Sequence, residues 1–172
     1  MKDEARVRTA VERNVKALTL RPTLGVGTAV TRAQLRDGLR CEIEEGPWKL
    51  TADLGEKSGG SNAGPNPGVL GRGALASCLV MSYAMWAAKR GVPLSSLEVE
   101  VQADYDARGH YGVADVTPGY TEVRYVVTIE SEAPESDILK MLDEADARTP
   151  YLNVFAEPQP VRREVRLVAR QS

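Results

Sequence analysis

The sequence is poor in the residues from which many functional sites are built. It has one histidine, His110, and two cysteines, Cys41 and Cys78, which are too few for a typical zinc site made by a single chain. A Ser-His-Asp triad would have to include His110, which lies in the run RGHYG and is interpreted as a solvated loop residue. Aromatic residues make up 5% of the chain, which argues against a stacking platform for single-stranded nucleic acid.

The charges are nearly balanced. Twenty-two Lys and Arg residues against 24 Asp and Glu residues give a net charge of −2, so the chain lacks the basic footprint of a nucleic-acid-binding protein. With 42% hydrophobic and 27% charged residues, the composition is that of a soluble globular chain and excludes a collagen, a disordered tail and a disulfide scaffold. The length of 172 residues predicts one domain, residues 1–172.

No segment predicts export or a membrane span. The N-terminus, from Met1 to Lys16, is charged and lacks the apolar core of a signal peptide. The most apolar stretch, residues 74–88, is shorter than the about 17–25 residues that a membrane helix needs. We therefore expect a cytoplasmic protein with reduced thiols and no membrane partner.

The N-terminal half predicts short elements around a glycine-rich loop. A polar helix over residues 2–17 ends at Arg21-Pro22, because proline does not continue a helix. The further expected elements are a strand over 24–31, a hairpin of 42–44 and 48–52 around Glu45-Gly46-Pro47, and a shaped loop over 55–68.

A long helix follows this loop. Asn66 is a favoured N-cap and Pro67 a favoured first residue, and Gly91 followed by Pro93 marks the end near Arg90. The second half of this helix is apolar on nearly every face, which indicates burial all round. A rod of about 36 Å is difficult for one small domain to enclose, so the sequence favours a dimer.

The C-terminal half predicts strands and one amphipathic helix. The expected elements are strands over 97–101 and 122–129, a loop over 110–119 between them, a helix over 135–148 capped by Ser136 and ended by Thr149-Pro150, and a last strand over 161–168. The order of elements predicts an α+β fold with a mainly antiparallel sheet.

Two neighbouring segments resemble a known family. The run GGSNAGPNPG over residues 59–68, followed by Leu75-Ala76-Ser77-Cys78-Leu79, is similar to the glycine-rich loop and cysteine-bearing helix of the OsmC/Ohr family of thiol peroxidases. The resemblance covers about residues 24–168 and leaves the N-terminal helix, residues 1–20, as an addition. It implies an intertwined homodimer in which two long central helices are buried together and the sites lie at the subunit interface.

The resemblance also implies a chemistry. Cys78 matches the peroxidatic cysteine, whose thiolate attacks a peroxide and becomes a sulfenic acid. The family's activating arginine comes from the N-terminal strands, where Arg32, Arg36 and Arg40 stand, and we favour Arg40 or Arg36. The sequence departs from the family in three places, one of which is that Cys41 matches neither family cysteine. Gly68 replaces a glutamate, and Thr149 replaces the second cysteine, which in the family resolves the sulfenic acid as a disulfide.

Helical geometry describes the surroundings of Cys78. Gly71, Ala74, Leu75, Ser82 and Met85 lie within about 60° of it, and these five residues are apolar or small and uncharged. Apolar surroundings disfavour a thiolate, so a basic residue from elsewhere would be needed. Arg72 lies nearer Gly68, where it could fill part of the space of the missing glutamate. Packing in the core or a dimer is expected of Met81, Met85 and Trp86.

Two functions remain open from the sequence. The first is a hydroperoxide reductase in oxidative-stress defence, with no cofactor or metal, that uses Cys78 and an external thiol reductant. The alternative is a homodimer without peroxidase turnover that binds a small apolar or thiol-reactive molecule. Cys41 is interpreted as an incidental thiol, although a disulfide between Cys41 and Cys78 is a further option.

Overall fold

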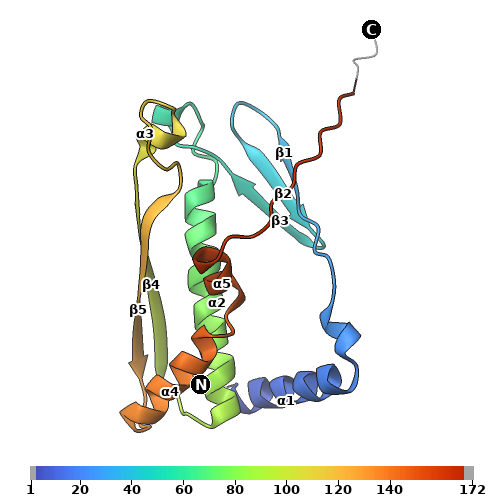
Figure 1. Ribbon diagram of the computed structural model, residues 1–172, viewed down its shortest axis with the longest axis vertical. Coiled ribbons are helices and arrows are strands. Elements are labelled where there is room, and N and C mark those ends of the chain that lie inside the picture. Colours follow the sequence, from blue (N-terminus) through green and yellow to red (C-terminus); the bar gives the residue numbers. More distant parts are fainter. Residues whose placement is uncertain (1–2, 169–172) are drawn as a thin grey trace.

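The computed structural model describes residues 3–168 and shows a long helix, α2, flanked by two antiparallel sheets (Figure 1). The N-terminal elements are α1 (Glu4–Leu20), a 3-10 turn η1 (Pro22–Gly25), β1 (Arg32–Leu35), β2 (Cys41–Glu45), β3 (Trp48–Ala52) and a second 3-10 turn η2 (Glu56–Ser58). The C-terminal elements are α2 (Pro67–Arg90), β4 (Ser96–Tyr105), α3 (Ala107–His110), β5 (Tyr120–Glu130), α4 (Glu135–Asp146) and α5 (Pro150–Ala156).

The ends of α2 are those that the sequence predicts. The Asn66 side chain accepts a hydrogen bond of 3.0 Å from the Val69 amide, and Pro67 is the first helical residue. At the other end Gly91 adopts a left-handed conformation with φ 71°, which glycine takes without steric cost, and its amide donates to the Ala87 carbonyl. These two caps define a helix of 24 residues.

One stripe of α2 packs on the ribbon formed by β4 and β5. The side chains of Leu75 and Leu79 are fully buried there, next to Ala145 of α4. Along β4, Leu97, Val99 and Val101 face the helix while the glutamates between them face outward, as the alternation of a half-buried strand requires. Burial of this apolar stripe is the main favourable contribution to the core.

A polar cluster lies within this core. Tyr83, 1% exposed, donates a hydrogen bond of 2.6 Å to Asp146, and Tyr125 of β5 donates one of 2.9 Å to the other oxygen of the same carboxylate. Burial, followed by the hydrogen bond to Asp146, raises the pKa of both tyrosines above the ordinary value. Both phenols therefore remain protonated donors, and they tie α2 and β5 to the end of α4.

The N-terminal sheet has the order β1-β2-β3. The predicted hairpin is confirmed, with Cys41 paired to Ala52 and Glu45 to Trp48. Gly46 has φ 54°, the left-handed region that glycine occupies without a side-chain penalty, and it forms the two-residue turn with Pro47. Trp48 and Leu50 remain 70% and 54% exposed, so little of the chain covers this sheet.

Three predictions about the elements are wrong. Residues 26–31 form no strand because no neighbouring strand of the described chain pairs with them, and Pro22 instead begins the turn η1. Residues 161–168 form no strand for the same reason, and Val161 is 91% exposed. Pro134, not Ser136, is the N-cap of α4, which ends at Asp146, and a separate helix, α5, follows.

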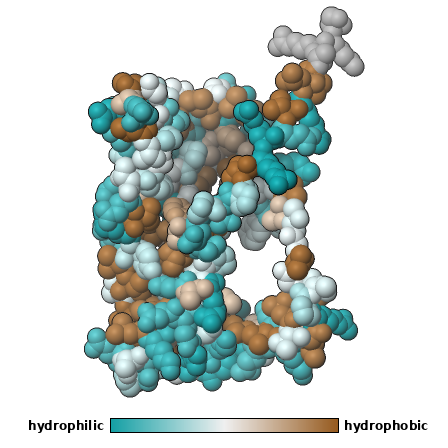
Figure 2. Space-filling view, viewed as in Figure 1, coloured by the Kyte–Doolittle hydropathy of each residue, from teal (hydrophilic) through white to brown (hydrophobic). Residues whose placement is uncertain are grey.

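The single chain leaves much apolar surface open. Every residue from 21 to 40 is exposed. The segment that joins η1 to β1 stands away from the rest of the chain, with an open gap beside it in the space-filling view (Figure 2). The side of α2 opposite its buried stripe is also open, since Met81 is 59% and Met85 45% exposed. The expectation that α2 is buried all round is therefore not met within one chain.

By length and composition alone, α2 could cross a membrane; no other helix of the described residues meets that test. A core helix of a soluble protein meets the same test, and the buried stripe of α2 packs against β4, β5 and α4. The structure thus gives α2 an apolar partner within the chain itself.

Asp53 fixes the glycine-rich loop that leads into α2. Its carboxylate is 2% exposed and accepts hydrogen bonds from the Leu54, Ser61 and Ala63 amides at 2.8–3.1 Å and from the Ser61 hydroxyl at 2.7 Å. The Ser61 hydroxyl, followed by these amides, lowers the pKa of Asp53 to about 2. Gly60 allows this close fold, because a Cβ there would lie 2.0 Å from the Leu54 carbonyl oxygen.

The Asp53 contacts predict an acid dependence of stability. The pKa of this group is 3.8 when unperturbed and about 2 in the fold, so its stabilisation is complete above about pH 4 and is lost as the pH falls through about 2. We expect Asp53→Asn to lower Tm at pH 7 and to flatten its decline over this window. Thermal melts from pH 2 to pH 7 measure both effects. Asp115→Asn, at an exposed loop position, is the control, and an equal change in both variants would contradict the prediction.

Candidate functional site

Cys78 lines an open groove on the exposed side of α2. The groove has a volume of about 480 Å³, within the range of small-molecule sites. Helix α2 contributes Ala74, Ser77, Cys78, Met81, Ser82, Met85 and Trp86, and the junction of α4 and α5 contributes Arg148, Pro150 and Tyr151. The lining is mostly apolar, which fits the apolar face that the sequence predicts for Cys78.

The thiol itself is free and half-buried. Cys78 forms no disulfide with Cys41, which lies on β2, so the option of that bond is wrong for this structure. Ser77, beside it, donates its hydroxyl back to the Ala74 carbonyl at 3.2 Å. Within residues 3–168, no ion pair or hydrogen bond connects a cation to Cys78.

The two arginines expected from the N-terminal strands lie on the hairpin of β1 and β2. Arg36 pairs with Glu42 at 2.7 Å, and its amide donates to the Arg40 carbonyl at 2.9 Å. Neither Arg36 nor Arg40 lines the groove, and both side chains are exposed. The choice between them stays a prediction, because this structure places neither side chain in the groove of Cys78.

Arg148 is the residue that sequence reasoning missed. It is the one charged residue of the described chain that lines the groove. Its guanidinium lies 5.2 Å from the ring centroid of Trp86, and its Nη1 donates to the Glu144 carbonyl at 2.9 Å. The only signal in the sequence was its position just before Thr149-Pro150, where the chain leaves α4.

Arg72 occupies the space next to Gly68, as the sequence predicts. A Cβ on Gly68 would lie 3.1 Å from Arg72 Nη1. The same Nη1 donates to the Tyr120 hydroxyl at 3.0 Å, and that hydroxyl donates to the Gly68 carbonyl at 3.4 Å. Tyr120 stacks on Phe155 of α5, with ring centroids 6.4 Å apart. A cation and a tyrosine therefore join the start of α2 to β5 and α5.

Thr149 is fully buried beside the groove. It is 1% exposed, and its hydroxyl donates to the Ala145 carbonyl at 2.9 Å. The next residues, Pro150 and Tyr151, line the groove that contains Cys78. Position 149 is thus close to the thiol in space, but it carries a hydroxyl that is already bonded and no second sulfur.

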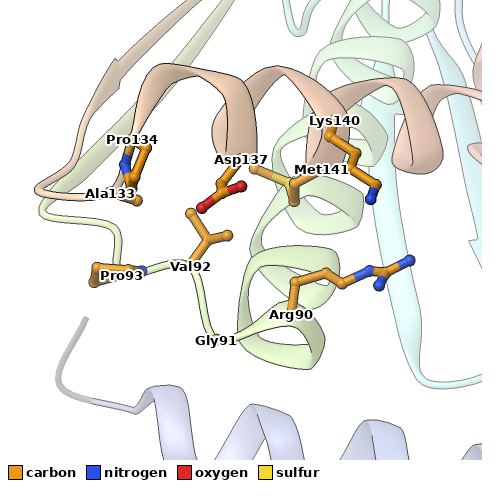
Figure 3. A pocket seen from close by; sticks show the side chains of 9 residues that line it. All are labelled: Arg90, Gly91, Val92, Pro93, Ala133, Pro134, Asp137, Lys140 and Met141. Carbon is orange, nitrogen blue, oxygen red and sulfur yellow. The ribbon is translucent and has the colours of Figure 1, made fainter.

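A second hollow, of about 410 Å³, lies where α2 ends against α4 (Figure 3). Asp137 and Lys140 of α4 and Arg90 of α2 extend around it. Arg90 is already paired with Glu144, and the hollow contains no thiol. No group of three or more His, Cys, Asp or Glu side chains in residues 3–168 could hold a metal ion. The Cys78 groove is therefore the candidate site.

Comparison with known proteins identifies the family. The model of the OsmC-like protein family matches residues 59–164, more than half of the chain. The chain belongs to the OsmC-like family. The match begins at the glycine-rich loop and includes α2, β4, β5, α4 and α5, so it covers the whole Cys78 groove.

Solved structures of OsmC-like proteins share the fold. An OsmC-like protein of Mycoplasma pneumoniae superposes with a TM-score of 0.64 at 18% identity, covering 75% of this chain and 87% of its own. The organic hydroperoxide resistance protein OsmC of Legionella pneumophila gives 0.55 at 16% identity, covering 76% and 90%. An OsmC-like hydroperoxide resistance protein of Jannaschia gives 0.51 at 16% identity, covering 81% and 91%. The predicted α+β class with antiparallel sheets is confirmed. Among curated proteins, none matches this chain.

The Arg72 contact predicts that the chain tolerates a glutamate at Gly68. Gly68→Glu places a carboxylate in the first turn of α2, where the helix dipole favours it, next to the flexible end of Arg72. We expect a coupling with Arg72 of about 0.2–1 kcal/mol, as for other partly exposed ion pairs. A double-mutant cycle of Gly68→Glu and Arg72→Gln in urea unfolding measures it. Gly73→Glu, in open space and not facing Arg72, is the control, and additive effects of the two substitutions would contradict the pairing.

Proposed function

We propose that this OsmC-like protein is a thiol-dependent hydroperoxide reductase of oxidative-stress defence that uses Cys78. The observation that carries the proposal is the position of Cys78: it is free and half-buried, and it lines an apolar groove within the family-matched region. Such a groove would admit an organic peroxide. The names of the Legionella and Jannaschia structures associate the fold with hydroperoxide resistance.

The reaction divides into two stages. The Cys78 thiolate attacks the terminal, hydroxyl-bearing oxygen of the hydroperoxide, so that an S–O bond forms and the O–O bond breaks. The alcohol leaves as an alkoxide and takes up the proton that the thiol lost. Cys78 is oxidised by two electrons to a sulfenic acid, and the peroxide is reduced to an alcohol.

The return of Cys78 to the thiol requires an external reductant. Thr149 offers no sulfur, and Cys41 lies on the N-terminal sheet and does not line the groove. An external thiol condenses with the sulfenic acid to give a mixed disulfide and water. A second thiol then releases Cys78 and leaves the disulfide of the reductant.

The second candidate is binding without turnover. Gly68 and Thr149 replace two groups of the family's catalytic set, and in residues 3–168 no cation is bonded to Cys78. A protein of this kind would bind a small apolar or thiol-reactive molecule in the groove and leave peroxide intact. The two candidates differ in whether Cys78 becomes a sulfenic acid.

The proposed reaction predicts a trapped intermediate. After a short pulse of low cumene hydroperoxide with a sulfenic-acid trap, intact-mass spectrometry should show one adduct on the native protein. Cys41→Ser is the matched control and should keep the adduct, whereas Cys78→Ser should lose it. A reduced, unlabelled Cys78 would favour binding without turnover. An adduct that is lost in Cys41→Ser and kept in Cys78→Ser would contradict the assignment of Cys78.

We further propose that the protein acts as a homodimer. Exposed apolar side chains gather on the segments that the single chain leaves uncovered, and a second copy would bury them. They include Val26 and Val30 before β1, Trp48 on β3, and Val161 and Leu167 near the C-terminal end of the described chain. β1 and β3 are the two edge strands of the N-terminal sheet, and their open backbone edges would also accept a further strand.

The dimer predicts twice the mass of one chain in sedimentation equilibrium. Val26→Asp should shift the protein toward the monomer, because it places a charge on a segment that the partner would cover. Leu139→Asp is the matched control: Leu139 is also exposed, but it lies between Glu135 and Asp143 on the outer face of α4, so the dimer should persist. A native protein of single-chain mass would contradict the dimer.

A further inference from the structure

The Cys78 groove contains the positive charge of Arg148, which forms no ion pair with any carboxylate of residues 3–168. Arg148 forms one hydrogen bond, to the Glu144 carbonyl, and no carboxylate in residues 3–168 lies within ion-pair distance of its guanidinium. The Glu144 carboxylate is already bound by Nε and Nη2 of Arg90, and Arg90 lowers its pKa accordingly. The charge of Arg148 also lowers the pKa of Glu144, but no carboxylate of the described chain accepts a hydrogen bond from Arg148.

Trp86 holds this guanidinium at the groove. The ring of Trp86 contacts two cations, with Arg148 Cζ at 5.2 Å and Lys89 Nζ at 4.0 Å from its centroid. Cation–π contacts of this kind position a cation without neutralising it. Trp86 and Arg148 both line the groove, whereas Lys89 does not. Of the two cations over the ring, only Arg148 can meet a ligand in the groove.

The rest of the lining is apolar or weakly polar. Met81, Met85 and Pro150 offer carbon and thioether surface, and the Ser77 hydroxyl is already bonded to its own helix. A ligand that complements this groove has an apolar body and one anionic group. A planar guanidinium matches a carboxylate best, because it can donate two parallel hydrogen bonds.

We propose that Arg148 is the specificity-determining residue of the Cys78 groove and that the groove takes an apolar organic molecule bearing a carboxylate. The proposal rests on the proposed function in one respect, that the Cys78 groove is the ligand site. Under the proposed reaction, Arg148 holds the carboxylate while the apolar body lies along α2 beside the thiol. Under binding without turnover, the same contact would select the bound molecule.

A pair of simple probes tests the charge requirement. Octanoate and octanamide have the same apolar chain and differ in the carboxylate. Binding is followed by the fluorescence of Trp86 in a Trp48→Phe background, because Trp48 is the only other tryptophan. We expect octanoate to bind about tenfold more tightly than octanamide, the range of a hydrogen bond to a charged group. Equal affinities would overturn the proposal.

Variants assign this preference to Arg148. Arg148→Gln should bring the two affinities together, and Arg148→Lys, which keeps the charge but not the paired donors, should retain part of the preference. Lys89→Gln is the matched control, because it removes the other cation over Trp86 but lies outside the groove, and it should keep the full preference. Unchanged melting temperatures show that the variants are folded. A full preference in Arg148→Gln, or its loss in Lys89→Gln, would overturn the assignment.

The same experiment in a Cys78→Ser background separates the two proposals. If this variant keeps the octanoate preference while the native protein forms no sulfenic acid, the role of Arg148 stands and the peroxidase function fails. If Cys78 forms a sulfenic acid but Arg148→Gln leaves the preference unchanged, the peroxidase function stands and the role of Arg148 fails.

Discussion

The packing of one stripe of α2 against the β4–β5 ribbon determines where every other functional element lies. Leu75 and Leu79 enter the sheet face, and Tyr83 lies on the same stripe of the helix. Because side chains four residues apart share a face of a helix, this stripe also fixes which residues point away from the core. Cys78, Met81 and Met85 fall on the other side and are presented to the groove.

The carboxylate of Asp146 fixes how α2, β5 and the end of α4 are oriented relative to one another. An apolar stripe alone tolerates sliding and rotation, since hydrophobic contact is not directional. Two phenols, from Tyr83 of α2 and Tyr125 of β5, donate to one carboxylate at the end of α4. The chain leaves α4 two residues later at Arg148, so the network also places the α4–α5 junction over α2. The position of Arg148 relative to Cys78 thus depends on a hydrogen-bonded cluster in the core.

The sequence predicted the parts of the fold that local chemistry determines. Both ends of α2 followed from Asn66-Pro67 and Gly91, and the hairpin turn followed from Gly46-Pro47, because each residue has a conformational preference that acts alone. The segments 24–31 and 161–168 have strand-like composition, but a strand also needs a hydrogen-bonding neighbour, and composition does not show whether one exists. The strands are therefore absent where the single chain offers no partner.

The candidate site also has one part that the sequence predicted and one part that it did not. The apolar face around Cys78 and the approach of Arg72 to Gly68 were predictable, because both depend on positions along one helix. Arg148 was not, because its approach to the groove requires α4 to end, the chain to turn at Thr149-Pro150, and the turn to pack on α2. With no second sulfur at position 149, that junction contributes a cation and an apolar wall. Under the proposed reaction, the reduction of Cys78 would fall to a molecule that enters the groove, because position 149 carries no second sulfur. Under the role proposed for Arg148, the groove would discriminate among such molecules by charge as well as by shape.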